Sequence, residues 1–277
     1  MSIIPTIAVL LTCHNRKDKT LQCLQALFAQ EGLGEDYAIE VFLVDDGSTD
    51  GSAEAIQFQF SKVTIIPGDG NLYWNRGMLK AWETAAATKD FDYYLWLNDD
   101  TFLYKNTLNV LLENIKYTNN HSIVCGVCKS KSTNSITYGG FKQSTHQLIN
   151  PNGIPQKCYF FNGNIVLIPK EVYKKNGMLD PYFRHAFGDF DYGLRALKQN
   201  IFSYISSEAV GVCEENQLSI WCNPKVSLLK RLKNLYTPLG MSPIQHFVYA
   251  KRHWGIIKGS KTFFSIHLRV FFPNLWL

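Results

Sequence analysis

The chain has 277 residues, enough for one large domain or two small ones, and its 46% of hydrophobic residues excludes a disordered chain. Its net charge of +5 is unevenly distributed. Residues 216–277 hold nine Lys and Arg side chains and no Asp or Glu, whereas residues 1–215 hold 19 basic and 23 acidic ones. This split argues against a nucleic-acid binder and indicates a mildly acidic body with a basic tail that meets an anionic partner.

The sequence also bears on where the protein works. No uncharged apolar run approaches the ~18 residues that span a bilayer, and the N-terminus lacks the charged region and cleavage site of a secretory signal. Seven cysteines are scattered without a disulfide framework, which suits a reducing compartment. We therefore expect a cytoplasmic protein, peripheral at the inner face of the plasma membrane.

Buried apolar runs alternate with helical periodicity through residues 1–128. The pattern predicts strands at 7–11, 39–44, 63–66, 93–97 and 122–127, and helices at 18–30, 77–88 and 107–116. Such alternation is typical of a doubly wound, mostly parallel sheet, in which ligands bind beyond the carboxyl ends of the strands. Polar clusters follow three of these strands, at 12–16, 45–46 and 98–100. We expect the three clusters to converge on one pocket.

The carboxylates at these strand ends suggest their chemistry. Asp99 and Asp100 suit a hard divalent cation, Mn or Mg, because such ions prefer oxygen ligands and are held by one or two carboxylates plus phosphate oxygens. Asp45 and Asp46 can accept hydrogen bonds from a base or a ribose. The alternatives are an acidic surface loop at 98–100 and a turn with a helix cap at 45–51.

After residue 128 the regular alternation of strands and helices ends. The pattern predicts a hairpin at 136–141, strands at 165–168, 201–205 and 209–213, helices at 170–175 and 189–199, and basic aromatic helices after residue 223. Asp189 and Asp191 stand where the helix of 189–199 begins. One of them can cap that helix, which suits Asp191, while the other can face the pocket as a general base.

Four segments together resemble family 2 of the inverting glycosyltransferases, in particular bacterial, rhamnosyltransferase-like enzymes that add sugars to cell-surface polysaccharides. The segments are LTCHNR at 11–16, VDDGSTDG at 44–51, LNDDT at 97–101 and GDFDYGLR at 188–195. The resemblance implies a GT-A fold: an α/β, doubly wound, mostly parallel sheet with a small antiparallel acceptor-side part and a helical C-terminal tail. It implies a nucleotide-sugar-binding half at 1–128, an acceptor-side half at 129–222, and the tail at 223–277.

The resemblance also implies roles for individual residues, with a nucleotide-diphosphate sugar as donor and a glycan or lipid-linked glycan as acceptor. The donor would be bound by Thr12, His14, Asn15, Arg16, Asp45, Asp46, Asn71, Arg76, Asn98 and Asp99. Asp100, with Asp99, would hold the divalent cation, and Asp189 would be the catalytic base. The acceptor side would include Trp74, Gly163, Asn164 and Asp191.

The sequence departs from the family pattern at three positions. Asn98 stands where many relatives have Asp, Gly188 stands where many have Glu, and no His occurs near Cys213, so Cys213 or Glu214 would substitute or that ligand is absent. Two other functions therefore stay open: a sugar-phosphate nucleotidyltransferase, which would need a Gly-rich loop in place of 12–16, and a non-catalytic nucleotide-sugar-binding module.

The basic tail interleaves its charges with Leu, Phe, Trp and Tyr, most densely at 254–258 and 263–272. This composition favours a helix that lies on an anionic membrane, near a lipid-linked acceptor. The alternative is that these aromatic side chains pack on the core or on a second subunit, in a homodimer.

Overall fold

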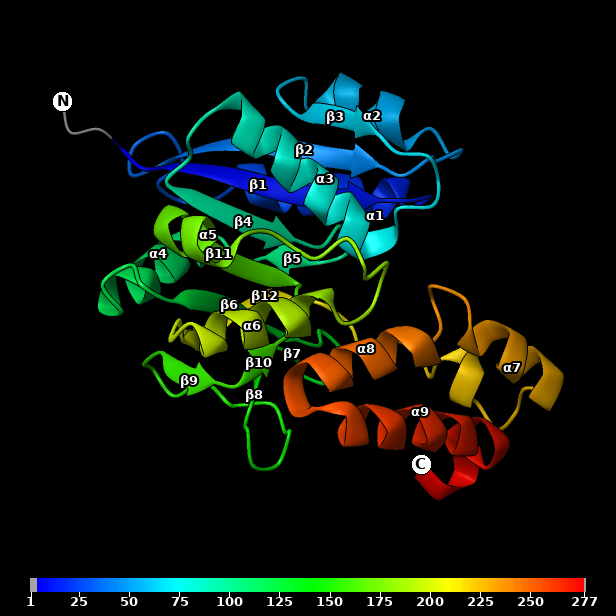
Figure 1. The fold of residues 1–277 in the computed structure, drawn as a ribbon. Coiled ribbons are helices and arrows are strands. Elements are labelled where there is room, and N and C mark those ends of the chain that lie inside the picture. Colours follow the sequence, from blue (N-terminus) through cyan, green and yellow to red (C-terminus); the bar gives the residue numbers. More distant parts are fainter. Residues whose placement is uncertain (1–3, 277) are drawn as a thin grey trace.

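The computed structural model describes residues 4–276 and contains one large mixed sheet flanked by helices (Figure 1). The sheet has the strand order β3-β2-β1-β4-β11-β6-β12-β5, with β7 paired to β6 and β9 to β12. Its strands are β1 (Thr6–Cys13), β2 (Ala38–Asp45), β3 (Thr64–Pro67), β4 (Tyr93–Leu97), β5 (Phe102–Leu103), β6 (Ile123–Lys129), β7 (Ile136–Tyr138), β9 (Gln156–Cys158), β11 (Ile165–Pro169) and β12 (Ser203–Val212). A second, two-stranded antiparallel sheet joins β8 (Gly140–Phe141) to β10 (Phe160–Phe161).

The strands of residues 1–97 are parallel, as the alternating pattern predicts. β1 pairs in parallel with β2 and with β4, while β11 is antiparallel and joins this half of the sheet to β6. The predicted mostly parallel α/β sheet with a small antiparallel part is therefore confirmed.

Two predictions about strands are wrong. The hairpin expected at 136–141 does not form, because β7 pairs with β6 and β8 pairs with β10. The two strands expected at 201–205 and 209–213 form a single strand, β12, with register shifts against β6 between Ile205 and Gly211. At this irregularity the hydroxyl of Ser206 accepts the N–H of Val127 (2.9 Å) and donates to the carbonyl of Glu208 (2.6 Å). A side chain thus supplies the missing ladder hydrogen bonds, which lets the strand continue through a polar interruption.

Helices cover both faces of the sheet. They are α1 (Lys17–Phe28), α2 (Ser52–Gln59), α3 (Tyr73–Thr88), α4 (Thr107–Tyr117), α5 (Lys170–Asn176) and α6 (Gly188–Lys198). One apolar core joins α1, α2 and α4 to the sheet, and the other joins α3, α5 and α6. At the centre of the second core lies the fully buried Trp82, with the rings of Tyr94, Trp96, Tyr173 and Tyr192 5.5–5.7 Å away.

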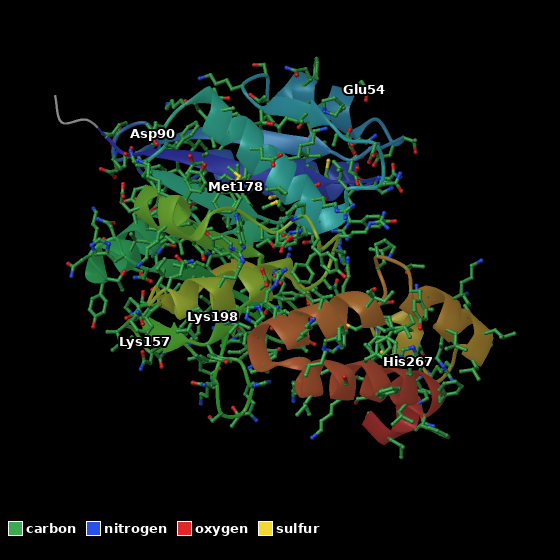
Figure 2. The ribbon with its side chains drawn as sticks, viewed as in Figure 1. Glu54, Asp90, Lys157, Met178, Lys198 and His267 are labelled. Atoms are coloured by element: carbon green, nitrogen blue, oxygen red, sulfur yellow. The ribbon has the colours of Figure 1, made fainter. Side chains whose placement is uncertain are left out.

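The tail forms three further α-helices, α7 (Leu228–Leu235), α8 (Pro243–Trp254) and α9 (Ile256–Phe271). α8 lies next to α6, α9 runs along α8, and α7 lies at the end of the tail away from α6 (Figure 1). Part of the tail packs on the core, because Tyr249 of α8 is buried against Phe183, Phe187 and Leu194. α9 packs against α7, and His267 of α9 hydrogen-bonds Tyr236 (2.7 Å; Figure 2). Among residues 4–276, no helix is both long enough and apolar enough to cross a membrane.

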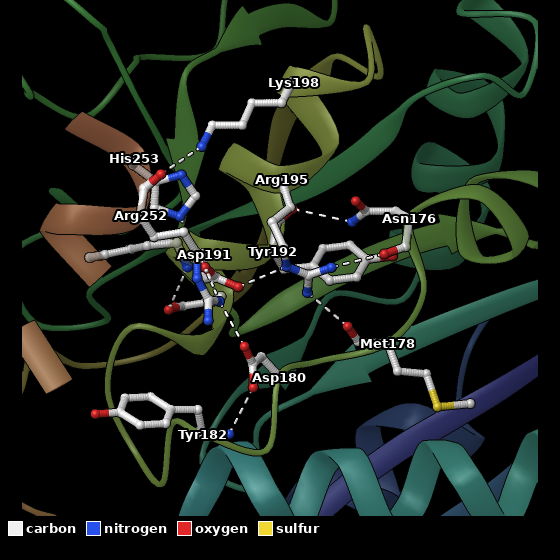
Figure 3. A network of polar contacts seen from close by, with 12 residues as sticks. Asn176, Met178, Asp180, Tyr182, Asp191, Tyr192, Arg195, Lys198, Arg252 and His253 are labelled. Carbon is white, nitrogen blue, oxygen red and sulfur yellow. Dashed lines mark hydrogen bonds and ion pairs between the residues drawn. The ribbon is translucent and has the colours of Figure 1, made fainter. Parts of the chain in front are cut away.

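A buried carboxylate fastens α8 to α6 (Figure 3). Asp191 is fully buried and accepts hydrogen bonds from Arg195 (Nε, 2.8 Å) of its own helix and from Arg252 (2.8 Å) and His253 (2.9 Å) of α8. Lys198, on the outer surface of α6 (Figure 2), adds a hydrogen bond of 2.8 Å to the carbonyl of Arg252 (Figure 3). Although burial alone would raise the pKa of Asp191, the hydrogen bonds from His253 and Arg195 outweigh it and lower that pKa.

These contacts place Asp191 in a link between helices, although the resemblance implies an acceptor-side role for it. All of its partners belong to the protein, and it does not line the cavity described below. Its position therefore favours a structural role over contact with the acceptor.

Replacing Asp191 should destabilise the protein strongly. Asp191→Asn removes the buried anion that Arg195 and Arg252, both partly exposed, share, although Arg252 keeps its pair with Asp180 (2.7 Å). The free energy of unfolding at pH 7 should therefore fall by about 1.5–3 kcal/mol. Because the folded-state pKa of Asp191 is lowered, the wild-type advantage should be present above about pH 4 and disappear as the pH falls below the folded-state pKa. Urea unfolding at several pH values measures both effects.

Asp90→Asn is the matched control, since Asp90 is exposed and its pair with Lys170 (3.0 Å) lies at the surface. This variant should unfold almost as the wild type does. Equal stability of Asp191→Asn and wild type would contradict the structural role.

Candidate functional site

The carboxyl ends of β1, β2 and β4 open onto one cavity of about 540 Å³. Its lining consists of Thr12, Cys13, His14, Arg16, Asp46, Gly70, Tyr73, Trp74, Asn98, Asp99, Asp100, Tyr138, Asn164, His185, Cys213, Asn216, Ser219 and Leu239. The three polar clusters at the strand ends thus do meet, as the sheet topology requires. The volume is in the range of small-molecule and cofactor sites.

Asp46 forms the wall of the cavity on the β2 side. Its carboxylate accepts the backbone N–H of Gly70 (Oδ1, 2.9 Å) and of Tyr73 (Oδ2, 2.9 Å), and its carbonyl oxygen is 2.7 Å from Nδ1 of His14. Gly68 permits this close approach, because a Cβ there would lie 2.6 Å from Oδ1 of Asp46. Asp46 therefore fixes the loop that precedes α3 while it lines the cavity.

Two residues expected to bind the donor instead serve the turn after β2. Oδ1 of Asp45 accepts the N–H of Ser48 (2.9 Å), and the side chain of Asn15 accepts the N–H of Thr49 (2.7 Å). Asn15 itself adopts a positive φ of 51°. Neither residue lines the cavity, so their contacts match the turn that the sequence offered as the alternative reading.

Arg76 and Asn71 also lie away from the cavity lining. The Nε of Arg76 donates to the carbonyl of Pro181 (2.9 Å), and the backbone N–H of Asn71 donates to Asp69 (2.9 Å). The phosphate contact expected of Arg76 stays a prediction, made from a side chain that lies outside the cavity lining.

Arg16 bridges the two carboxylates that follow β4. One of its nitrogens, Nη1, lies 3.1 Å from Oδ1 of Asp99 and 2.9 Å from Oδ2 of Asp100. Asp99 is almost fully buried, and this burial raises its pKa to about 6 although the nearby Arg16 opposes the shift. A single cationic group thus satisfies both carboxylates.

The donor set at this point fits a divalent cation. The guanidinium shows that oxygens of Asp99 and Asp100 can share one positive charge, and two carboxylates plus substrate phosphates are a usual set for Mg²⁺. Among the described residues 4–276, no group of three or more His, Cys, Asp or Glu is arranged to hold a metal. The protein would therefore supply two ligands here, and the remainder would come from the donor and water.

Neither candidate for a third ligand is well suited. Burial and the nearby Asp100 raise the pKa of Cys213 to about 11, and sulfur is a soft ligand that suits Mn²⁺ or Mg²⁺ poorly. Glu214 instead accepts hydrogen bonds from Ser130 (2.7 Å) and the backbone of Lys131 (2.7 Å).

Asn98 holds a tryptophan at the cavity wall. Its side-chain oxygen accepts the indole N–H of Trp74 (2.6 Å), and both residues line the cavity. The indole packs directly on Gly163, where a Cβ would overlap the ring. Asn98 therefore orients Trp74 on the acceptor side, next to Gly163 and Asn164.

Asp189 lies in the layer behind Gly163, half-buried at the start of α6. Its carboxylate accepts the N–H of Gly163 (Oδ2, 2.9 Å) and of Phe190 (Oδ1, 2.9 Å). Burial raises its pKa to about 6, against the effect of these two hydrogen bonds. A carboxylate of that pKa is ionised near neutral pH and can still accept a proton, as a general base must.

The backbone just before Asp189 is held in an uncommon conformation. Phe187 has φ 73° and ψ −15°, and its ring stacks on Tyr249 (5.0 Å between centroids) and His246 (4.9 Å), both from α8. A non-glycine residue with positive φ needs such support from its surroundings. The tail thus helps to shape the turn that presents Asp189.

Tyr73 and His185 also line the cavity, and burial with the nearby Arg16 lowers the pKa of His185. Three further lining residues carry no sequence motif. Asn216 and Ser219 come from the segment that leads into the tail, and Leu239 comes from the tail itself, between α7 and α8.

Comparison with solved structures shows which folds are similar. The chain matches the TarS structure from S. aureus with TM-score 0.56 and 16% identity, over 90% of this chain and 42% of that one. It matches the mannosyltransferase PcManGT from Pyrobaculum calidifontis, solved with GDP-Man and Mn²⁺, with TM-score 0.59 and 13% identity over 99% and 75%. TarS 1–349 in complex with UDP-GlcNAc gives TM-score 0.58 and 13% identity over 97% and 73%.

These structural similarities show a shared fold and confirm the expected GT-A architecture. No curated protein sequence matches the chain. The family model described as "Glycosyl transferase family 2" matches residues 8–177, which include all three strand-end clusters. The chain is therefore a glycosyltransferase, and it belongs to glycosyltransferase family 2.

Proposed function

We propose that the protein transfers a sugar from a nucleoside diphosphate donor to an acceptor hydroxyl, with inversion at the anomeric carbon. The observation that carries this proposal is the arrangement of carboxylates. Asp99 and Asp100 line the cavity next to Asp46, while Asp189 stands behind Trp74 and Gly163 on another side. One pair can thus serve the donor diphosphate while a separate base serves the acceptor.

On the donor side, Thr12, His14 and Asp46 would contact the nucleoside, and Arg16 the phosphates. Asp99 and Asp100 would hold a divalent cation, Mn²⁺ or Mg²⁺, which when bound supplies positive charge to the departing diphosphate. Structures with the same fold were solved with GDP-Man and Mn²⁺ and with UDP-GlcNAc, which supports donors of this class.

On the acceptor side, Asp189 would take the proton of the attacking hydroxyl. The oxygen would then form its bond to the anomeric carbon as the bond to the diphosphate breaks, and the bonding electrons would leave with the nucleoside diphosphate. Attack opposite the leaving group inverts the configuration. Trp74 and Asn164 would position the acceptor sugar, since both line the cavity next to the Gly163 turn.

Donor binding is the direct test of this function. Nucleoside diphosphate sugars with uridine, guanosine or deoxythymidine should be screened by thermal unfolding, with and without Mn²⁺. At least one should raise the midpoint, since a ligand at 100 times its Kd stabilises the folded state by about 2.7 kcal/mol. If none of them shifts the midpoint in the presence of Mn²⁺, the donor class is wrong.

The base assignment predicts a selective loss of turnover. Asp189→Asn should lower kcat by about 10²- to 10⁴-fold and leave the thermal shift by the donor intact, because the side chain serves the acceptor. In the wild type, kcat/KM should fall as the pH drops through about 6, since the raised pKa of Asp189 leaves the base protonated below that value.

Asp90→Asn again serves as the control, with an unchanged rate and pH profile. Full transfer activity in Asp189→Asn would remove Asp189 from the mechanism.

We further propose that the acceptor is a lipid-linked glycan of cell-surface polysaccharide synthesis and that the tail docks on an anionic membrane. Ile257, Phe264 and Leu268 of α9 are 71%, 66% and 52% exposed and form part of one shallow apolar groove with Lys261. Leu239, also exposed, lies in the lining of the cavity. An apolar face without any acidic neighbour in residues 216–277 fits an anionic lipid surface.

Vesicle binding tests the docking surface. Combined Ile257→Ser, Phe264→Ser and Leu268→Ser should weaken sedimentation with phosphatidylglycerol vesicles by about tenfold or more, because three exposed apolar side chains no longer enter the interface. Phe58→Ser is the matched control, since Phe58 is 90% exposed on α2 in the acidic body.

Unchanged vesicle binding by the triple variant would exclude this face. If the variant instead changes the oligomeric state, the groove is the contact of a homodimer.

A further inference from the structure

Arg16 occupies the place between the two carboxylates where a cation would be held. Its Nη1 is the only atom of the guanidinium that contacts them, at 2.9 Å from Asp100 and 3.1 Å from Asp99. The backbone of Arg16 is fixed at the start of α1, because its carbonyl accepts both the N–H and the hydroxyl of Thr20 (3.0 Å each). The side chain is 46% exposed and lies along the cavity.

Two adjacent carboxylates at a strand end repel each other unless a positive charge lies between them. Here that charge is internal to the protein. A divalent cation binds carboxylate oxygens at about 2.0–2.2 Å. At Oδ1 of Asp99 and Oδ2 of Asp100 it would place a second positive charge beside Nη1, which lies within 3.1 Å of both oxygens. Arg16 and a metal ion at these oxygens therefore repel each other and compete for the same negative charge.

We propose that Arg16 is a resident counter-cation that competes with the divalent cation for Asp99 and Asp100, so that the metal ion binds strongly only together with the donor diphosphate. The diphosphate provides the missing oxygen ligands and at the same time offers Arg16 a new anionic partner. This inference rests on the cation site of the proposed function.

The length and exposure of Arg16 make the exchange feasible. Its fixed backbone keeps the guanidinium within the cavity, while its half-exposed side chain can turn from the carboxylates toward a ligand in the same space. Guanidinium groups bind phosphate as well as carboxylate. Arg76, by contrast, donates to the carbonyl of Pro181 and has no contact with either carboxylate.

The experiment measures Mn²⁺ binding to the full chain by electron paramagnetic resonance, without nucleotide. Arg16→Gln should bind Mn²⁺ about tenfold tighter than the wild type, because the competing charge is gone. Arg16→Lys keeps a cation and should retain the weak binding of the wild type. Arg76→Gln removes the same charge elsewhere and should leave Mn²⁺ affinity unchanged.

Addition of UDP or GDP should abolish the advantage of Arg16→Gln over the wild type, because Arg16 then pairs with the diphosphate. An Arg16→Gln variant that binds Mn²⁺ no better than the wild type overturns the competition. So does an equal gain in Arg76→Gln, which would reflect net charge alone.

A second substitution separates this inference from the cation site itself. Asp100→Asn, alone and combined with Arg16→Gln, should abolish Mn²⁺ binding. If it has no effect in either background, the cation site of the proposed function is wrong. If it abolishes binding while Arg16→Gln equals the wild type, the cation site stands and only the role of Arg16 fails.

Discussion

The parallel pairing of β1 with β2 and β4 is the constraint on which the site depends. Cys13 stands opposite Asp45, and Leu10 opposite Trp96, so the three strands end at the same edge of the sheet. A shift of one residue in either pairing would turn the side chains of a strand to the other face and disrupt both apolar cores. The cores therefore hold the register, and the register brings the polar clusters together.

Burial and partners distinguish the carboxylates of this region. Asp191 is fully buried and has both oxygens engaged by side chains of α6 and α8, so it holds two helices together. Asp46 binds the backbone of a loop but also lines the cavity, as do Asp99 and Asp100, whose shared partner Arg16 is half-exposed. Asp189 accepts backbone N–H groups beside a glycine. Residues of one chemical type thus differ in how far a ligand could reach them.

Local signals in the sequence were sufficient for most of the strands and helices and for the convergence of the strand-end clusters, because these follow from periodicity and from the topology of parallel sheets. They failed at 136–141 and 201–213, where pairing with distant strands decides the structure. They did not separate Asp45 from Asp46. Both follow the same buried run, but Asp45 turns to Ser48, whereas Asp46 faces Gly70 and the cavity. Which of two neighbours faces a ligand depends on contacts between distant segments, which periodicity does not encode.

The same limit applies to Asp191 and Arg76, whose partners lie 61 and 105 residues away. Asp191 stands two residues after Asp189 in a segment that resembles a catalytic motif, yet its nearest cations come from α6 and α8. A buried acid next to a catalytic one has no distinguishing local pattern. The contribution of the tail to the cavity, through Asn216, Ser219 and Leu239, is invisible for the same reason.

The positive charges of the tail fall into two groups, arginines that contact the rest of the protein and lysines that face the solvent. The arginines of the tail serve the fold: Arg231 is buried and donates to the carbonyl of Val226, Arg252 pairs with Asp191 and Asp180, and Arg269 lies over the ring of Trp221. All six lysines of the tail are exposed, namely Lys225, Lys230, Lys233, Lys251, Lys258 and Lys261.

This separation follows from the chemistry of the two side chains. The planar guanidinium is weakly hydrated and binds several acceptors at once, which suits a buried link, whereas the ammonium is strongly hydrated and stays in water. The charge that holds the tail to the acidic body is therefore distinct from the charge that the tail presents outward. An anionic surface can be bound by the lysines without competing for the ion pairs that keep α8 against α6.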